Sequence, residues 1–139
     1  MRAVLRARWV ELGDKIVAIA EAFPPSAYDE RPVTEVRSFG EQLRHIAFWN
    51  QYVTAALQGT AIDGQPNELP RAAYPTKAEV VDVLKTGFTD VVRTLGVGDQ
   101  PVPPAVVDTM ISFLEHNGEH YGQLAVYCRL RGIVPPASR

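Results

Sequence analysis

The three histidines of this chain are the residues whose type and spacing point most directly to chemistry. His116 and His120 are four residues apart, and His45 lies far upstream. In a helix, residues at i and i+4 share one face, so this pair can meet a third histidine carried by a second helix. Three neutral imidazoles around one point form a divalent transition-metal site with positions left for water or substrate. We therefore expect His45, His116 and His120 to be metal ligands.

The residues around the histidine pair do not match the zinc-protease motif, in which a glutamate directly follows the first histidine. Glu115 and Glu119 instead directly precede His116 and His120. On a helix they project about 100° away from the histidines, so we interpret them as solvated residues or as partners of the ligands. The spacing alone also fits hydrogen-bonded core histidines, and this alternative stays open.

Four segments carry apolar residues every three or four positions, which predicts four amphipathic helices. Two of them open with a capping box, at Ser38–Glu41 and at Thr76–Glu79. The predicted helices are residues 4–23, 38–58, 76–95 and 105–131. Strand signals are nearly absent, and no repeat or composition shift marks a second domain. The prediction is an all-α four-helix bundle in a single domain, residues 1–139.

The predicted helices differ in how they place the histidines. On the last helix, an inward-facing line of residues runs from Val106 to Leu130. His116 and His120 occupy positions in this line where the pattern would lead one to expect leucine. His45 lies on the flank of the apolar stripe of its own helix, which suits a cleft better than an enclosed structural ion. Two of the connectors exceed a dozen residues, which indicates crossovers or functional loops.

Composition excludes several classes of protein. The chain has 139 residues, 46% of them hydrophobic and 22% charged, which is typical of an ordinary globular protein. A formal net charge of -2 gives no basic field for nucleic acid, and no apolar run is long enough to span a membrane. The N-terminus does not resemble a signal peptide, so the expected localisation is cytoplasmic. The single cysteine, Cys128, excludes an internal disulfide, and we interpret it as a buried small hydrophobe.

Three runs of sequence resemble motifs of the DinB/YfiT-like superfamily of metalloenzymes. They are VRSFGEQLRHIA (36–47), EHNGEHYGQL (115–124) and the ending YCRLRGIVPPASR (127–139). The resemblance implies an up-up-down-down bundle with a long crossover. It also implies a three-histidine site for zinc or nickel, with His45, His116 and His120 as the ligands, and frequently a homodimer.

The resemblance leaves the chemistry open among three hypotheses. The first is a metal-dependent enzyme that activates a low-molecular-weight thiol cosubstrate for transfer to a small-molecule electrophile. The second is a metal-dependent hydrolase, with Glu41 as a candidate base, although Glu41 also fits the capping box with Ser38. The third is a non-catalytic, metal-stabilised binding or stress-response protein. A divalent ion lowers the pKa of a bound water or thiol, so both enzyme hypotheses share one physical basis. No catalytic residue is assigned by the sequence.

Overall fold

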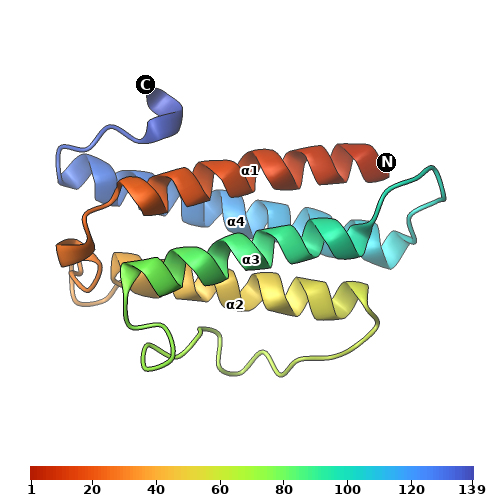
Figure 1. Cartoon of the computed structure of the whole chain (residues 1–139), viewed down its shortest axis with the longest axis horizontal. Coiled ribbons are helices and arrows are strands. Elements are labelled where there is room, and N and C mark those ends of the chain that lie inside the picture. Colours follow the sequence, from red (N-terminus) through yellow and green to blue (C-terminus); the bar gives the residue numbers. More distant parts are fainter.

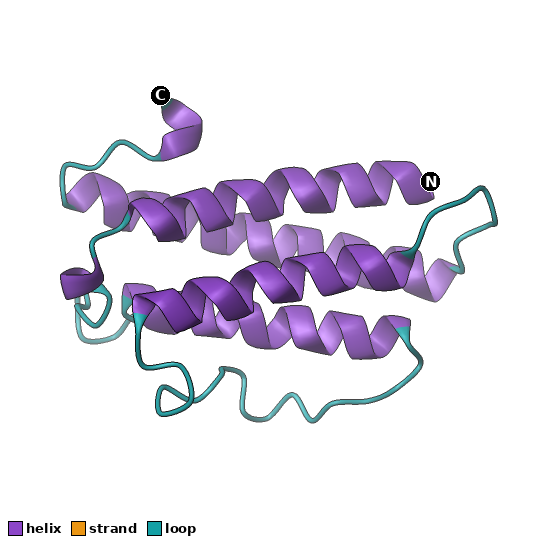
Figure 2. Cartoon of the chain, viewed as in Figure 1, coloured by secondary structure: helices purple, strands orange, loops and turns teal.

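The computed structural model describes residues 1–139 and contains four α-helices and no strand (Figures 1 and 2). The helices are α1 (Arg2–Ala22), α2 (Phe39–Leu57), α3 (Lys77–Leu95) and α4 (Pro104–Leu130). Two short 3₁₀ helices, η1 (Pro25–Ala27) and η2 (Pro136–Ser138), follow α1 and α4. The predicted all-α bundle is therefore confirmed, and each helix begins and ends within two residues of its predicted bounds.

Both predicted capping boxes form. At the start of α2, the Glu41 backbone N–H donates to Ser38 Oγ at 3.2 Å, and the Ser38 backbone N–H donates to Glu41 Oε2 at 2.7 Å. Thr76 and Glu79 make the same reciprocal pair at the start of α3. Each box satisfies two backbone N–H groups that have no partner inside the helix, and this fixes where the helix begins.

The helices run in an order that differs from the up-up-down-down pattern. Figure 1 shows α1 and α4 running in one direction and α2 and α3 in the other. Side-chain contacts agree, because Lys77 Nζ at the start of α3 donates to Phe23 O at the end of α1, at 2.8 Å. At the opposite end, Arg6 of α1 donates to Gly96 O, just after α3, at 2.9 Å. The pattern is thus up-down-down-up, which corrects the order implied by the resemblance while leaving the bundle itself intact.

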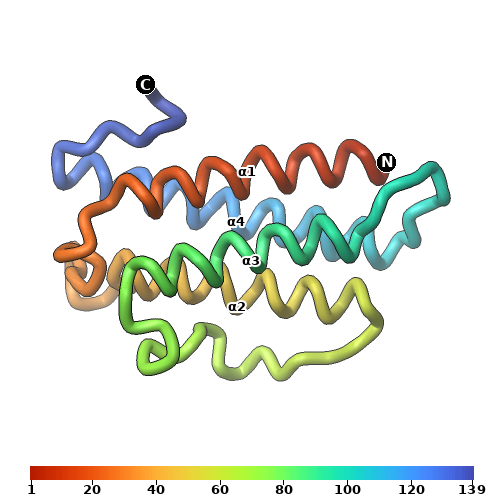
Figure 3. Tube along the Cα trace, viewed as in Figure 1, coloured from red at the N-terminus to blue at the C-terminus, as the bar shows by residue number.

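The parallel pair α2 and α3 requires a long crossover, and the connector formed by residues 58–76 supplies it (Figure 3). This connector returns along the length of α2 before α3 begins. Leu69 is buried at 7% exposure and anchors the connector, and its backbone N–H donates to Arg44 O of α2 at 3.3 Å. The anchor holds the neighbouring Asn67 and Glu68 beside α2, where the candidate site lies.

The core lies between the four helices and is built from large apolar side chains. α1 packs against α3 and α4, and α2 also packs against α3 and α4. The pairs α1–α2 and α3–α4, which are consecutive in the chain, therefore lie diagonally across the bundle. The largest fully buried apolar side chains are Trp9, Ile16, Ile19, Phe39, Leu43, Ile46, Leu84, Met110 and Leu124. No helix contains an apolar stretch of the length needed to cross a membrane.

The buried face of α4 is offset from the predicted one. Its most buried residues include Met110, Asn117, Leu124 and Cys128, whereas Leu130, predicted to face inward, is 67% exposed. The reason is that α4 packs against both α1 and α2, so its core face points between those two helices. The histidines consequently lie on the flank of α4 next to α2. Cys128 is buried, as predicted.

Candidate metal centre

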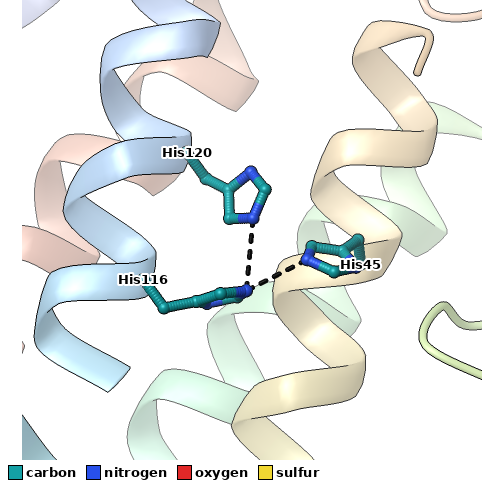
Figure 4. Close-up of side chains that lie close together, drawn as sticks. All are labelled: His45, His116 and His120. Carbon is teal, nitrogen blue, oxygen red and sulfur yellow. Dashed lines mark hydrogen bonds between the residues drawn. The ribbon is translucent and has the colours of Figure 1, made fainter. Parts of the chain in front are cut away.

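The antiparallel packing of α2 and α4 brings the three histidines together (Figure 4). His116 and His120 project from successive turns of α4, and His45 projects toward them from α2. His45 Nε2 lies 3.0 Å from His116 Nε2, and His120 Nε2 lies 3.2 Å from the same atom. All three residues thus direct the same ring nitrogen toward one point.

These separations fit the coordination sphere of a divalent ion. Two metal–imidazole bonds of about 2.0–2.1 Å place their nitrogens about 3.3 Å apart at a tetrahedral angle and about 2.9 Å apart at a right angle. The two measured separations, 3.0 and 3.2 Å, lie between these values. The three ligand nitrogens lie within 4.8 Å of one another, so small side-chain rotations suffice for one ion to reach all of them.

The opposite ring nitrogens face oxygen acceptors, which favours the tautomer with the proton on Nδ1. His45 Nδ1 lies 2.6 Å from the backbone carbonyl of Asn67, and His120 Nδ1 lies 2.7 Å from Gln42 Oε1. His116 Nδ1 lies 3.4 Å from Asn117 Oδ1. A carbonyl oxygen only accepts, so each Nδ1 carries the proton and donates it. Three unprotonated Nε2 lone pairs then face one another, an arrangement that a cation between them stabilises.

Burial keeps the imidazoles neutral. His45 is 5% exposed and His120 is 8% exposed. Desolvation is the largest cause of the shifts and lowers the pKa of His45 to about 4 and the pKa of His120 to about 4. It also lowers the pKa of His116, which is half-buried. Because a metal ligand must be deprotonated, these shifts leave the nitrogens ready to bind a cation at neutral pH.

Two pockets reach the histidines and differ in character. The smaller, about 460 Å³, is lined by all three histidines, and its other walls are Arg37, Trp49, Asn67, Ser112 and Phe113. The larger, about 720 Å³, is mostly polar and is lined by Arg31, Glu35, Val36, Arg37, Glu41, Gln42, Glu68, His120, Gln123, Val126 and Tyr127. Arg37 and His120 line both pockets, so the histidine cluster is accessible from each of them.

The structure separates the other candidate residues. Arg31 donates to Glu41 Oε1 at 2.5 Å, and the capping box occupies Glu41 Oε2. Both carboxylate oxygens of Glu41 are therefore engaged in structural hydrogen bonds. Glu115 and Glu119 are exposed, as expected for solvated residues. Gln123, although exposed, lines the larger pocket, and its Oε1 accepts from Gln42 Nε2 at 2.8 Å and from His120 Nδ1 at 3.0 Å.

The aromatic residues near the histidines differ in which pocket they line. Trp49 lines the smaller pocket, where its ring contacts that of Phe113 at an interplanar angle of 32° with the centroids 5.5 Å apart. Tyr127 is buried in the core and also lines the larger pocket. Tyr52 contacts Trp49 edge to face but lines neither pocket.

Sequence reasoning missed four residues of the site: Gln42, Arg37, Asn67 and Glu68. Asn67 has a positive φ of 58°, a conformation in which asparagine is enriched, and its side chain accepts a hydrogen bond from Trp49 Nε1 at 2.9 Å. The preceding proline predicts a turn at Asn67, but nothing in the sequence indicates that its carbonyl reaches His45. Gln42 is one turn before His45 on α2 and carried no signal of its own.

Comparison with known proteins agrees with this geometry. No curated protein matches the chain. A model of the DinB superfamily matches residues 8–124, a range that contains His45, His116 and His120. The ending from Tyr127 onward lies outside the matched range. The chain belongs to the DinB superfamily.

Proposed function

We propose that His45, His116 and His120 hold one divalent transition-metal ion, zinc or nickel, and that the protein is an enzyme that transfers a thiol cosubstrate to an electrophile. One observation carries the proposal: three Nε2 atoms converge while their Nδ1 protons are directed outward to oxygen acceptors. Three protein ligands leave coordination positions open, as in catalytic rather than structural sites.

When bound, a divalent ion lowers the pKa of a coordinated thiol or water and so supplies a nucleophile at neutral pH. The protein contributes the orientation of the imidazoles and the shape of the surrounding pockets. Gln42 and the Asn67 carbonyl hold the rings of His120 and His45 in place. Trp49 and Phe113 give the smaller pocket an apolar wall suited to the carbon skeleton of an electrophile.

The choice of thiol transfer over hydrolysis depends on the absence of a free base next to the histidines. Hydrolysis of an amide requires a group that takes a proton from water and gives one to the leaving group. The smaller pocket, which all three histidines line, contains no carboxylate. In the larger pocket, Glu41 is in its capping box, Glu68 is paired with Arg37, and Glu35 is exposed and makes no hydrogen bond to a histidine. A thiol needs no such base once its pKa is lowered.

The test combines metal content with turnover. We expect protein purified without a histidine tag to contain about one equivalent of metal, and a His116→Ala variant to contain almost none. The metal-loaded protein should conjugate monochlorobimane with at least one of a panel of cellular thiols, and the variant should not. Glu119→Gln is the matched control, because Glu119 is exposed and directly precedes His120.

The possible outcomes separate the hypotheses. Metal retention without conjugation of any thiol would contradict thiol transfer. Ester or amide hydrolysis by the same protein would then favour the hydrolase, and a chelator-sensitive melting temperature with no turnover would favour a metal-stabilised binding protein. Equal metal content in the wild type and in His116→Ala would contradict the ligand assignment itself.

A further inference from the structure

Arg37 lines both pockets and therefore lies where they meet. It directly precedes Ser38, the N-cap of α2, and it lines the pocket that contains all three histidines as well as the larger polar pocket. The hydroxyl of Tyr127, on α4, donates to the backbone carbonyl of Arg37. The backbone of Arg37 is therefore held by both helices that carry the histidines.

The side chain of Arg37 is fixed at one nitrogen and free at the other two. Its Nε donates to Glu68 Oε1 at 3.1 Å, and this is the one hydrogen bond of the guanidinium. The two terminal Nη groups have no partner within the chain, and the side chain is 34% exposed. Arg37 differs in this from Arg31, whose Nη groups donate to Val36 O at 2.9 Å and Glu41 Oε1 at 2.5 Å.

With a divalent ion bound, the charges around the histidines favour the binding of an anion. The three imidazoles are neutral, and the charges of Arg37 and Glu68 cancel. A divalent ion held by the histidines would therefore leave two uncompensated positive charges in a partly buried site. Such charge is costly to desolvate unless a bound anion balances it.

We propose that Arg37 forms an anion subsite beside His45, His116 and His120, and that the small molecule bound there carries a carboxylate. This inference rests on the proposed metal site. The two Nη groups of a guanidinium lie in one plane and donate in parallel, which matches the two oxygens of a carboxylate. Glu68 is the positioning residue, because its bond to Nε orients the guanidinium and leaves the Nη pair available. A carboxylate and a thiolate on one ligand would together balance the charge of the ion.

The test measures binding with a pair of probes that differ in one charge. Cobalt-substituted protein is titrated with 3-mercaptopropionate and with 3-mercaptopropionamide, and binding is followed by the change in the visible absorption of cobalt. We expect the wild type to bind the carboxylate about tenfold more tightly than the amide, as a bidentate charge-assisted pair implies. Arg37→Gln should bring the two affinities within about twofold by weakening only the binding of the carboxylate.

Three further variants separate a specific contact from a general charge effect. Arg31→Gln removes the same charge from the larger pocket and should keep the preference, because its Nη groups are already occupied. Arg37→Lys keeps the charge but loses the planar pair, so most of the preference should disappear. Glu68→Gln should weaken the preference. A preference that is absent in the wild type, or that persists in Arg37→Gln, would overturn the proposal.

A second pair of probes distinguishes a failure of the anion subsite from a failure of the proposed thiol-transfer function. If neither thiol changes the cobalt spectrum, thiol activation is contradicted, and the anion subsite is then tested with propionate and propionamide by ligand-observed NMR. Binding of propionate by the wild type that is lost in Arg37→Gln supports the subsite on its own. Equal binding of propionate by both proteins overturns it. Far-ultraviolet circular dichroism shows that each variant is folded.

Discussion

Acidification of the metal-free protein should destabilise it through the buried histidines. Each imidazole has an ordinary pKa of 6.5, and the folded protein lowers the pKa of His45 and of His120 to about 4, with burial as the main cause. Between these pH values the unfolded chain binds protons that the folded chain does not. Stability is therefore fully present above pH 6.5 and is lost progressively as the pH falls toward 4.

The pKa difference sets the size of the effect. One pKa unit corresponds to about 1.4 kcal/mol, so each of the two histidines contributes on the order of 3 kcal/mol of destabilisation by pH 4. Together they approach the total stability of an ordinary domain, about 5–15 kcal/mol. From the two protons of His45 and His120 alone, the free energy of unfolding should rise with pH by up to about 3 kcal/mol per unit inside this window. His116, whose pKa is also lowered, adds to the slope in the same direction.

The assay is urea unfolding of chelator-treated protein, followed by circular dichroism at half-unit steps from pH 7.5 to 4. The matched comparison is His45→Gln/His116→Gln/His120→Gln, which keeps polar side chains but removes all three titrating imidazoles. We expect its pH dependence between 4 and 6.5 to be nearly flat. A wild-type free energy of unfolding that stays constant over this window would mean that the histidines protonate freely in the folded state, and would contradict the lowered pKa values.

Three more predictions test the surroundings of the site and the fold. Gln42→Leu/Gln123→Leu removes both acceptors of His120 Nδ1, so metal affinity should fall by about 10–100-fold in competition with a chromophoric chelator, and unchanged affinity would contradict this role. Leu124→Ala opens a cavity in the core and should lower the free energy of unfolding by about 2–5 kcal/mol in urea. Ser38→Ala removes the cap of α2 and should lower the melting temperature, at a cost of about 1 kcal/mol; an unchanged melting temperature would contradict the capping role.

Local signals in the sequence predicted the helices and the shared face of His116 and His120. The capping boxes at Ser38 and Thr76 mark helix starts through contacts between residues three apart, so they are visible in the sequence. The i, i+4 spacing of His116 and His120 likewise guarantees a shared face once the segment is helical. These features depend only on neighbours in the chain, and the structure reproduces them.

The remaining features depend on how distant segments pack. Which helix lies beside α4 is decided by the whole bundle, so the spacing of His116 and His120 does not show that His45 approaches from α2. The offset of the buried face of α4 has the same origin, because it follows from contact with α1 and α2 together. Arg37 and Asn67 reach the site only because the crossover returns along α2, a path that no local pattern encodes.

Anomalous X-ray diffraction from crystals of metal-loaded protein shows whether the three imidazoles share one ion. Data collected on both sides of the zinc or nickel absorption edge locate the ion independently of the protein model. We expect a single strong peak about 2.0–2.1 Å from the Nε2 atoms of His45, His116 and His120. A peak bound by fewer than three of these nitrogens, or no peak between α2 and α4 in protein that contains metal, would contradict the three-histidine site.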